Sequence, residues 1–269
     1  MKEIHAGIIG LGVGEQHLLG FLKNKNCKVK LICDFDQKKL NEVSAKYPYL
    51  KTTLNPDDVL NDPFINLVSI ASYDNFHCEQ ILKAFKNNKH VFVEKPLCQN
   101  EEEFNLIVDA IKQKPRLQLS SNLILRKVPR FIDLKENLNQ GSLGKTYLFQ
   151  TSYDYGRLHK ITNGWRGEIP FYSVMHGGGI HLIDLIMWLS NKKILSVNSV
   201  GTNNISSKSK FKFYDCVISN LKLSDDSIAS VTANFPSVTP HGHRVSVFAE
   251  KGTSHHGPLG CAYFKSRNP

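Results

Sequence analysis

The amino-terminal part of the chain alternates short apolar runs with amphipathic helical stretches, and this rhythm restricts the possible folds more than any other feature. The apolar runs include "HAGIIG", "KVKLIC", "INLVSIAS", "HVFV" and "RLQLSS". Alternating strands and helices are typical of βαβ crossovers, which build a parallel sheet with helices on both faces. The sequence therefore predicts a doubly wound α/β domain over residues 1–121.

The rhythm changes in the remainder of the chain, residues 122–269. After a helix at "PRFIDLKENLNQ" and an apolar helix at "IHLIDLIMWLS", runs such as "ILSVNSV", "CVISNLKL", "SIASVTANF" and "HRVSVFAE" alternate apolar and polar residues. Period-two strands with few helices are typical of an open, mainly antiparallel sheet. We expect an α+β domain here, joined without a linker and ending in a loop at "CAYFKSRNP".

Composition narrows the class of protein. The chain has 269 residues, 41% of them hydrophobic, and no apolar run of the length that a membrane span needs. Its start leads into a strand without a signal-peptide pattern, and its six cysteines form no C-x-x-C pair. These features predict free thiols, a cytoplasmic protein and no metal site. His241 and His243, in "TPHGHR", are expected in an exposed loop.

The net charge of +10 raises the question of a nucleic-acid partner. Lysines and arginines are dispersed among acids and polar residues, however, and do not cluster in one segment. Dispersed charge is typical of a solvated surface, so no nucleic-acid partner is expected. A dinucleotide or a phosphorylated substrate would also be favoured by a positive field.

A glycine-rich loop, "GLGVGEQH", follows the first strand and precedes a helix. Gly10 and Gly12 would allow a tight turn and a close approach of backbone amides to a diphosphate, with Val13 and Gly14 in the same loop. The pattern G-x-G-x-x-G would place a glycine at position 15, where Glu15 stands. Alone, the motif fits a dinucleotide loop and a plain strand-to-helix turn about equally.

The context of the loop favours the dinucleotide. Asp34 ends the second strand about twenty residues further on, where a carboxylate can accept hydrogen bonds from the adenosine ribose. A carboxylate there repels a 2′-phosphate, and Phe35 rather than an arginine follows, so NAD is favoured while NADP stays open. Asp36 could be the ribose ligand instead, or could cap the next helix.

A lysine and a proline follow the buried strand "HVFV". In open α/β sheets, ligands bind outside the carboxyl ends of the strands, so Lys95 should line the same crevice as Asp34 and the loop "SYDNFH". A surface lysine is the alternative. Pro96 argues against it, because proline fixes the backbone direction and can take a cis bond.

Together, "GIIGLGVGEQH", "SIASYDNFH", "VFVEKPL" and "GGGIHLIDLIMWL" resemble the Gfo/Idh/MocA family of dehydrogenases along nearly the whole chain. The resemblance implies a Rossmann domain and a carboxyl-terminal domain whose open antiparallel sheet supports a homodimer or homotetramer. It also implies NAD(P)-dependent hydride transfer with a secondary alcohol or ketone of a sugar, cyclitol or nucleotide sugar. A catalytically inactive dinucleotide-binding sensor or regulator is the alternative.

The same resemblance assigns roles in the first domain. Lys95 would hydrogen-bond the reacting oxygen, the peptide before Pro96 would be cis, and Glu94 would contact the nicotinamide ribose. Residues after the third strand would pack on the cofactor, namely Ser72, Asn75 and His77.

In the second domain, His181 is the expected base, since oxidation of an alcohol needs a group with a pKa near neutrality. A core histidine on an apolar helix is the alternative. Asp184 lies three residues on, where it could orient the imidazole or touch a substrate hydroxyl. Many family members carry an Asp four residues before this histidine, but Gly177 stands there. Whether His176 replaces it, or Lys95 acts alone, stays open.

Three further residues are candidates for binding the substrate. Trp165 could form a pocket wall, and Arg166 could bind a hydroxyl, carboxylate or phosphate, as could Arg126 at the entry to the second domain; each could instead be structural. Family members usually extend further at the carboxyl end. The chain is therefore either a shortened variant or a truncated sequence.

Overall fold

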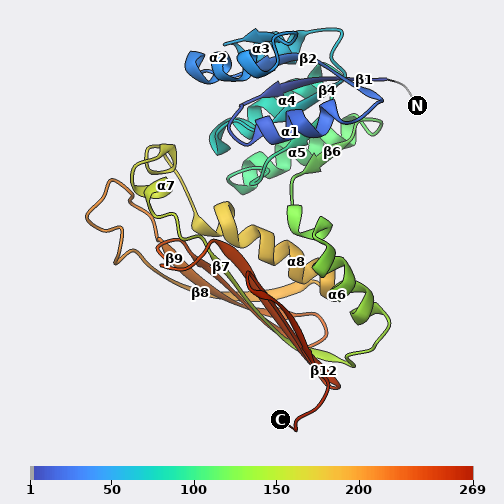
Figure 1. The fold of residues 1–269 in the computed structure, drawn as a ribbon, viewed down its shortest axis with the longest axis vertical. Helices are drawn as coiled ribbons and strands as arrows, with labels where there is room; N and C mark the ends of the chain where they lie inside the picture. Colours follow the sequence, from blue (N-terminus) through green and yellow to red (C-terminus); the bar gives the residue numbers. More distant parts are fainter. Residues whose placement is uncertain (1–2, 269) are drawn as a thin grey trace. The chain divides into compact units, whose positions relative to one another are not determined.

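The computed structural model describes residues 3–268, and the chain divides into two compact units. The first extends to Asn122 and the second begins at Leu123. Each unit is built on one β-sheet (Figure 1). Each also has its own hydrophobic core.

The first unit is built on a six-stranded sheet in the order β3-β2-β1-β4-β5-β6. All of its neighbouring strands run parallel, which confirms the doubly wound sheet. The strands are β1 Ile4–Ile9, β2 Cys27–Cys33, β3 Lys51–Thr53, β4 Leu67–Ile70, β5 His90–Val93 and β6 Leu119–Ser121.

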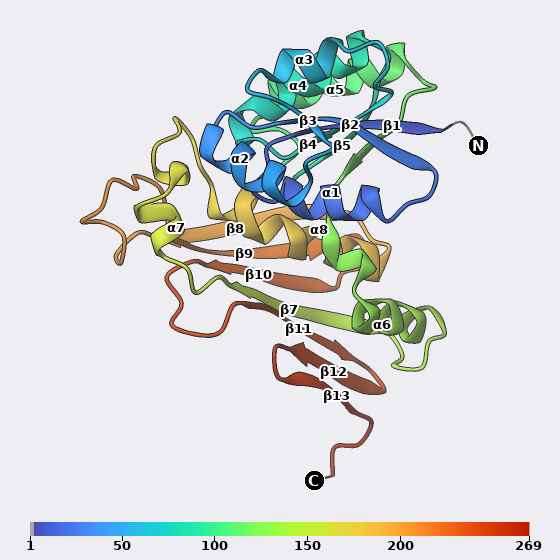
Figure 2. The same cartoon turned by 45° about the horizontal axis from the view of Figure 1, so that its top comes forward.

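Helices cover both faces of this sheet: Figure 2 shows α1 and α2 on one side and α3, α4 and α5 on the other. Successive residues of a strand point to opposite faces, so Ile8 packs in the core under α1 and α2 while Ile9 packs in the other core. The helices are α1 Gly14–Leu22, α2 Gln37–Lys46, α3 Pro56–Asn61, α4 His77–Lys86 and α5 Glu101–Gln113, with a short 3₁₀ turn, Asp74–Phe76, before α4.

Side-chain caps fix where several of these helices begin. The carboxylate of Asp36 accepts the backbone N–H of Lys38 at 2.8 Å, and the side chain of Asn100 caps α5 in the same way. Asn55 caps α3, and Pro56 occupies its first turn. Periodicity does not predict β3 or α3, because neither is long enough to show a repeat; the Asn-Pro pair was the available signal.

The second unit contains a seven-stranded sheet in the order β13-β12-β11-β7-β10-β9-β8. Its neighbours are antiparallel except for β10 and β7, which run parallel, so the open, mainly antiparallel sheet is confirmed. The strands are β7 Thr146–Asp154, β8 Ile194–Thr202, β9 Cys216–Leu223, β10 Ile228–Asn234, β11 Gly242–Ala249, β12 Gly252–Gly257 and β13 Gly260–Phe264.

One face of this sheet carries the core of the second unit. Phe131 and Leu134 of α6 and Leu185 and Ile186 of α8 pack with Val231 and other strand residues. The helices are α6 Pro129–Asn139, α7 His159–Thr162 and α8 Ile180–Ser190; Ile124–Lys127 and Trp165–Gly167 form 3₁₀ turns, and Met175–Gly179 forms a π-helical turn that leads into α8.

Two loop predictions in this unit are wrong. The segment expected to end the chain as a loop contains β13, which pairs with β12 as an antiparallel hairpin, with His256 opposite Cys261. His243 lies within β11 and not in an exposed loop, because the period-two pattern of that strand starts at Gly242. For β13 the pairing partner, which is absent from the local pattern, decides that the segment is a strand.

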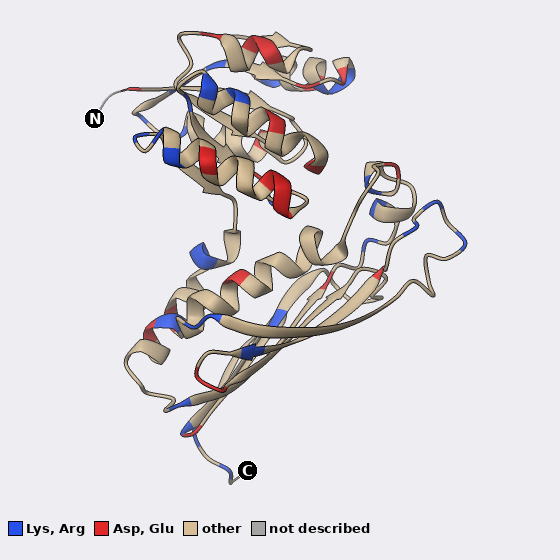
Figure 3. Ribbon diagram, turned by 180° about the vertical axis from the view of Figure 1, so that it is seen from behind, with Lys and Arg blue, Asp and Glu red and all other residues tan. Residues whose placement is uncertain are grey.

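Basic and acidic residues alternate along several helices of the first unit. Figure 3 shows acidic and basic segments mixed along the helices of the first unit. Within the described residues, no helix is both long enough and apolar enough to cross a bilayer. The same residues hold no group of three or more His, Cys, Asp or Glu side chains placed to bind a metal ion.

Candidate functional site

The loop between β1 and α1 has the backbone geometry that a diphosphate requires. Gly10 has φ of +86°, and a Cβ added there would lie 2.3 Å from the carbonyl oxygen of Ala71, so only glycine fits this turn. A Cβ at Gly12 would meet nothing within 4 Å, which leaves open space over the loop. The loop therefore combines a tight turn with room for a group lying against its amides.

Gly14 allows the close packing of helix on sheet that the third glycine of the motif usually allows. A Cβ at this position would lie 3.2 Å from the Cβ of Ala71 and 3.3 Å from Cγ2 of Ile8. The start of α1 therefore approaches β1 and the end of β4 more closely than a side chain would comfortably allow. The glycine comes one residue early, but the close packing of helix on sheet is retained.

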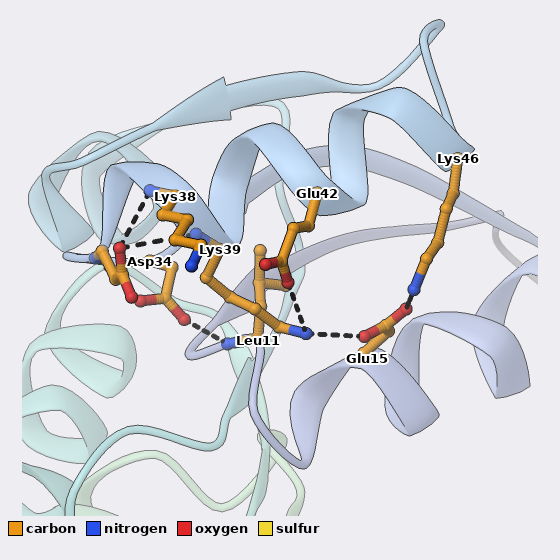
Figure 4. A network of polar contacts seen from close by, with 8 residues as sticks. Leu11, Glu15, Asp34, Lys38, Lys39, Glu42 and Lys46 are labelled. Carbon is orange, nitrogen blue, oxygen red and sulfur yellow. Dashed lines mark hydrogen bonds and ion pairs between the residues drawn. The ribbon is translucent and has the colours of Figure 1, made fainter.

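Glu15, which stands where the motif would have glycine, is held by two lysines of α2. Lys39 Nζ lies 2.9 Å and Lys46 Nζ 2.7 Å from its two carboxylate oxygens (Figure 4). Hydrogen bonds from Lys46 and Lys39 lower the pKa of the Glu15 carboxyl. The negative charge next to the glycine loop is thus compensated within the α1–α2 face.

Asp34 is buried at the end of β2 and connects that strand to the glycine loop. Its Oδ2 accepts the N–H of Leu11 at 2.7 Å (Figure 4), and its Oδ1 accepts the N–H of Asp36 at 2.9 Å. Each carboxylate oxygen keeps a lone pair for another donor, such as a ribose hydroxyl. Of the two aspartates considered from sequence, Asp36 is the cap of α2.

The segment after β4 joins the same edge of the sheet. Ser72 donates its hydroxyl to Gln80 Oε1 at 2.7 Å, and the side-chain oxygen of Asn75 is buried without a hydrogen-bond partner. A buried acceptor without a donor is costly in a protein interior unless a ligand satisfies it. Asn75 is therefore the residue of this segment whose surroundings most favour a bound group.

His77 supports the turn that carries Lys95. Its ring is fully buried, with Nδ1 2.7 Å from the carbonyl oxygen of Pro96 and Nε2 3.2 Å from that of Ser72. The Lys95–Pro96 peptide is cis, which confirms the expectation for this turn. His77 thus braces the backbone on either side of the predicted cofactor edge.

Glu94 is surrounded by donors at the carboxyl end of β5. Its Oε1 lies 2.6 Å from Asn122 Nδ2 and 3.1 Å from His17 Nε2. Burial raises the pKa of the Glu94 carboxyl, but hydrogen bonds from His17 and Asn122 and the charge of Lys95 outweigh it and leave that pKa below its ordinary value. The carboxylate is therefore ionised at neutral pH. Sequence reasoning missed His17 and Asn122; the position of Asn122 directly after a strand was the available signal.

In the second unit, His181 lies on α8 and is buried among aromatic rings. Its ring centroid is 5.7 Å from that of His243 and 6.5 Å from that of Tyr153. The His243 ring stacks on Tyr153 at 4.6 Å, and the Tyr153 hydroxyl lies 2.9 Å from Nε2 of His241. Sequence reasoning missed Tyr153 and assigned His241 and His243 to a loop.

Burial makes two members of this aromatic cluster hard to ionise. It lowers the pKa of His243 to about 4, with smaller contributions from His241 and Arg130, and it raises the pKa of Tyr153. At neutral pH both side chains are therefore uncharged. His181 consequently faces a neutral aromatic wall formed by β7 and β11.

The glycines before α8 are required by close contacts. A Cβ at Gly177 would lie 2.0 Å from the hydroxyl oxygen of Tyr172, and one at Gly178 would lie 2.1 Å from Cδ1 of Tyr153. An aspartate at position 177 would collide with Tyr172. His176, considered as its replacement, packs its ring against Phe171 at 5.8 Å.

Arg126 and Asp184 form an ion pair with each other. Arg126 Nε donates to Asp184 Oδ2 at 2.8 Å, and a second guanidinium nitrogen donates to Oδ1. The hydrogen bonds to Asp184 raise the pKa of Arg126. From sequence these residues were given separate roles, toward the substrate and toward His181; the structure joins α8 to the turn before α6 through them.

Trp165 and Arg166 also interact. The Arg166 guanidinium lies over the Trp165 ring at 4.5 Å and near the Tyr172 ring at 5.9 Å. A guanidinium stacked on an aromatic ring is held in a defined orientation, with its N–H groups at the edge of the plane.

A six-stranded doubly wound sheet with a tight glycine loop after its first strand, followed by an open, mainly antiparallel sheet, is the architecture of two-domain nicotinamide-dependent oxidoreductases. Residues 4–122 match the oxidoreductase family with an NAD-binding Rossmann fold, and residues 131–255 match the GFO/IDH/MocA carboxyl-terminal domain. The chain therefore belongs to the Gfo/Idh/MocA family, and the resemblance noted from sequence is confirmed.

Among curated relatives, the chain is 24% identical to myo-inositol 2-dehydrogenase of Thermotoga maritima, over 91% of this chain and 73% of the relative. It is 26% identical to scyllo-inositol 2-dehydrogenase (NAD(+)) of Bacillus subtilis, over 96% and 75%.

Solved structures share the fold. Scyllo-inositol dehydrogenase of Lactobacillus casei with bound NAD(H) and scyllo-inositol has a TM-score of 0.84 at 22% identity, covering 99% of this chain and 83% of that one. Levoglucosan dehydrogenase with NADH and levoglucosan has a TM-score of 0.88 at 21% identity, covering 99% and 77%.

Proposed function

We propose that the protein is an NAD-dependent dehydrogenase that transfers a hydride between nicotinamide and a CH–OH group of a cyclitol or sugar. The observation that carries the proposal is an ionised Glu94, directly followed by Lys95 and its cis peptide to Pro96, at the carboxyl end of β5 in the same parallel sheet as the glycine loop. The relatives named as inositol and levoglucosan dehydrogenases support the substrate class. An inactive sensor has no observation in its favour.

The residues of the first unit fit NAD. We assign the diphosphate to the loop at Gly10, Gly12, Val13 and Gly14 and the amino end of α1, and the adenosine ribose to Asp34. Ser72, Asn75 and His77 lie in or under the same edge. When bound, the nicotinamide supplies the acceptor or donor of the hydride.

The protein's own side chains handle the proton. We assign Lys95 to hydrogen-bond the reacting oxygen and His181 to take the hydroxyl proton, because an imidazole is the side chain most often used as a general base. Asp184 acts through its ion pair with Arg126, which fixes the helix that carries His181. Trp165, Arg166 and His176 are assigned to the sugar or cyclitol.

We also propose a cytoplasmic location and a homo-oligomer formed through the second sheet. The described cysteines are unpaired, and burial raises the pKa of Cys33 to about 12 and of Cys78 to about 11, as suits inert thiols in a reducing compartment. On the sheet, several large apolar side chains are exposed, including Leu195, Val197 and Val200 of β8.

The function is tested by supplying cyclitols, sugars and nucleotide sugars with NAD or NADP and following the absorbance of the reduced nicotinamide. We expect turnover of at least one polyol with NAD. Lys95→Ala should lower kcat by on the order of 10² to 10⁴-fold while the Kd for NAD changes little, because the lysine acts on the reacting oxygen. The matched control, Lys112→Ala on the exposed face of α5, should behave as wild type. Turnover that survives Lys95→Ala unchanged would contradict the mechanism.

A further inference from the structure

A buried chain of hydrogen bonds lies behind Glu94, formed by four side chains from separate elements of the first unit. His17 comes from α1 and Ser69 from β4, Glu94 follows β5, and Asn122 follows β6. Ser69 is fully buried and His17 is 8% exposed. Up to 105 residues separate the members along the chain, so only the folded sheet brings them together.

Ser69 and Glu94 determine which nitrogen of the His17 ring donates a hydrogen bond and which accepts one. Glu94 is an ionised acceptor, so Nε2 of His17, 3.1 Å from Oε1, must carry a hydrogen and donate it. Nδ1 lies 2.9 Å from the Ser69 hydroxyl, which can donate to it. The tautomer with its hydrogen on Nε2 satisfies both contacts, with the hydroxyl donating to Nδ1 and Nε2–H donating to the carboxylate.

The order serine, histidine, acid also occurs in hydrolases, but this one is not a nucleophile site. Ser69 has no exposed surface and lies in the middle of the parallel sheet, on β4 between β1 and β5. A nucleophile must reach the carbonyl that it attacks, and its base must lie within reach of the same substrate. The chain of hydrogen bonds therefore ends at Glu94, at the sheet edge.

The geometry fixes the plane of the Glu94 carboxylate. Oε1 takes both donors, Asn122 Nδ2 at 2.6 Å and His17 Nε2 at 3.1 Å, and this leaves Oε2 directed at the backbone N–H of Lys95 at 3.3 Å. Without His17, one of the two donors on Oε1 is lost, and the carboxylate gains freedom to rotate away from Lys95.

We propose that His17 is a positioning residue of the dehydrogenase, which holds the Glu94 carboxylate in the orientation that places it beside Lys95, with Ser69 setting the tautomer of the ring. The inference rests on the proposed function, because the benefit is a Glu94 carboxylate held in one orientation next to the lysine of the proposed reacting centre. A shift of about 1 Å in such a group can cost on the order of 10²-fold in rate.

The test compares His17→Leu, which removes both hydrogen bonds at similar volume, with His17→Gln, which keeps a side-chain N–H donor for Glu94. We expect His17→Leu to lower kcat about 10- to 100-fold with the Kd for NAD within about threefold of wild type. His17→Gln should recover most of the loss. Ser69→Ala, which leaves the imidazole in place, should cause a smaller fall of about threefold.

His90→Leu is the matched control for loss of a histidine. His90 lies at the other end of β5, where its Nδ1 accepts the N–H of Gln118 at 3.0 Å. This variant should lose some thermal stability and keep the wild-type kcat. It therefore separates a general weakening of the sheet from an effect on Glu94.

¹⁵N NMR of the histidine side chains in the full chain shows which ring nitrogen of His17 carries a hydrogen. In the wild-type chain we expect His17 to carry its hydrogen on Nε2. In Ser69→Ala we expect this preference for one tautomer to be lost. Equal kcat in wild type, His17→Leu and His17→Gln, or a hydrogen on Nδ1 alone, would overturn the positioning role. A wild-type chain that binds NAD and turns over no polyol would overturn the proposed dehydrogenase instead, and the NMR reading would still decide the tautomer.

Discussion

His243 shows how a side chain that looks exposed in the sequence becomes largely enclosed by aromatic neighbours. Its ring stacks on Tyr153, and its Nε2 is buried without a hydrogen-bond partner. Burial of an imidazole disfavours the charged form, which is why the pKa of His243 falls to about 4 from the ordinary 6.5. The neutral ring is compatible with its surroundings and the imidazolium is not.

This shift predicts a loss of stability in acid. Above pH 6.5 the ring is neutral in both folded and unfolded chains, so the packing contributes fully; as the pH falls from 6.5 to 4, the unfolded chain takes up a proton that the folded chain refuses. We expect the free energy of unfolding to fall by about 2 kcal/mol over this range from His243, allowing for its partial exposure. His243→Phe should flatten the dependence in denaturant titrations at several pH values. The control is His159→Gln, at an exposed histidine of α7, which should show the wild-type dependence of the free energy of unfolding on pH. If His243→Phe also shows the wild-type dependence, the assignment to His243 is wrong.

At the scale of elements, the two glycines at the start of α1 have different structural roles. Gly12 faces open space, whereas Gly14 lies against Ala71 and Ile8. A side chain at Gly12 would therefore take room that a ligand needs, and a side chain at Gly14 would push the helix from the sheet.

Substitution of Gly12 should weaken NAD binding, whereas substitution of Gly14 should lower the stability of the fold. Gly12→Val should raise the Kd for NAD at least about tenfold and change the melting temperature little, because a Cβ added at Gly12 has no atom within 4 Å. Gly14→Val should lower the free energy of unfolding by about 1–3 kcal/mol, because it overpacks the contact between α1 and the sheet. Gly20→Ala, on the same helix with no atom within 4 Å of the added Cβ, should stabilise it slightly. Calorimetry and NAD titration measure both properties, and a Gly12→Val chain that binds NAD as wild type would refute the loop assignment.

At the scale of the whole molecule, the second unit has one covered and one open sheet face. The covered face forms its core, while Val197 is 62% exposed on β8 and Ile228 is 50% exposed on β10. These two residues also line a shallow hollow with Leu148 of β7. Large apolar side chains exposed among polar ones on an open sheet face favour a second copy of the chain.

Val197→Glu should therefore shift the native mass toward the monomer, since a carboxylate buried between copies without a partner is costly. Val238→Glu is the control, at a fully exposed loop position of the same unit. Light scattering coupled to size exclusion measures the mass of both. A wild-type chain that is already monomeric, or a Val197→Glu chain that keeps the wild-type mass, would exclude this face as the interface.

The sequence by itself determined the order and type of most elements and the placement of the functional residues at strand ends. Periodicity is a local property, and it located β1, β2, β4 and β5, so that Asp34 and Lys95 could be placed at one edge of a parallel sheet. Short elements such as β3, and the hairpin of β12 and β13, carry too few residues to show a repeat of their own.

Only the tertiary structure decided which side chains complete the site. The hydrogen bonds of Glu94 come from His17 and Asn122, which are far from it in the chain, and the collision of Tyr172 with any side chain at position 177 depends on how α8 packs. The pairing of Arg126 with Asp184 likewise appears only when the turn before α6 meets α8. A pattern along the chain reports the direction in which a residue points, whereas its partners are set by packing between elements, which no local pattern encodes.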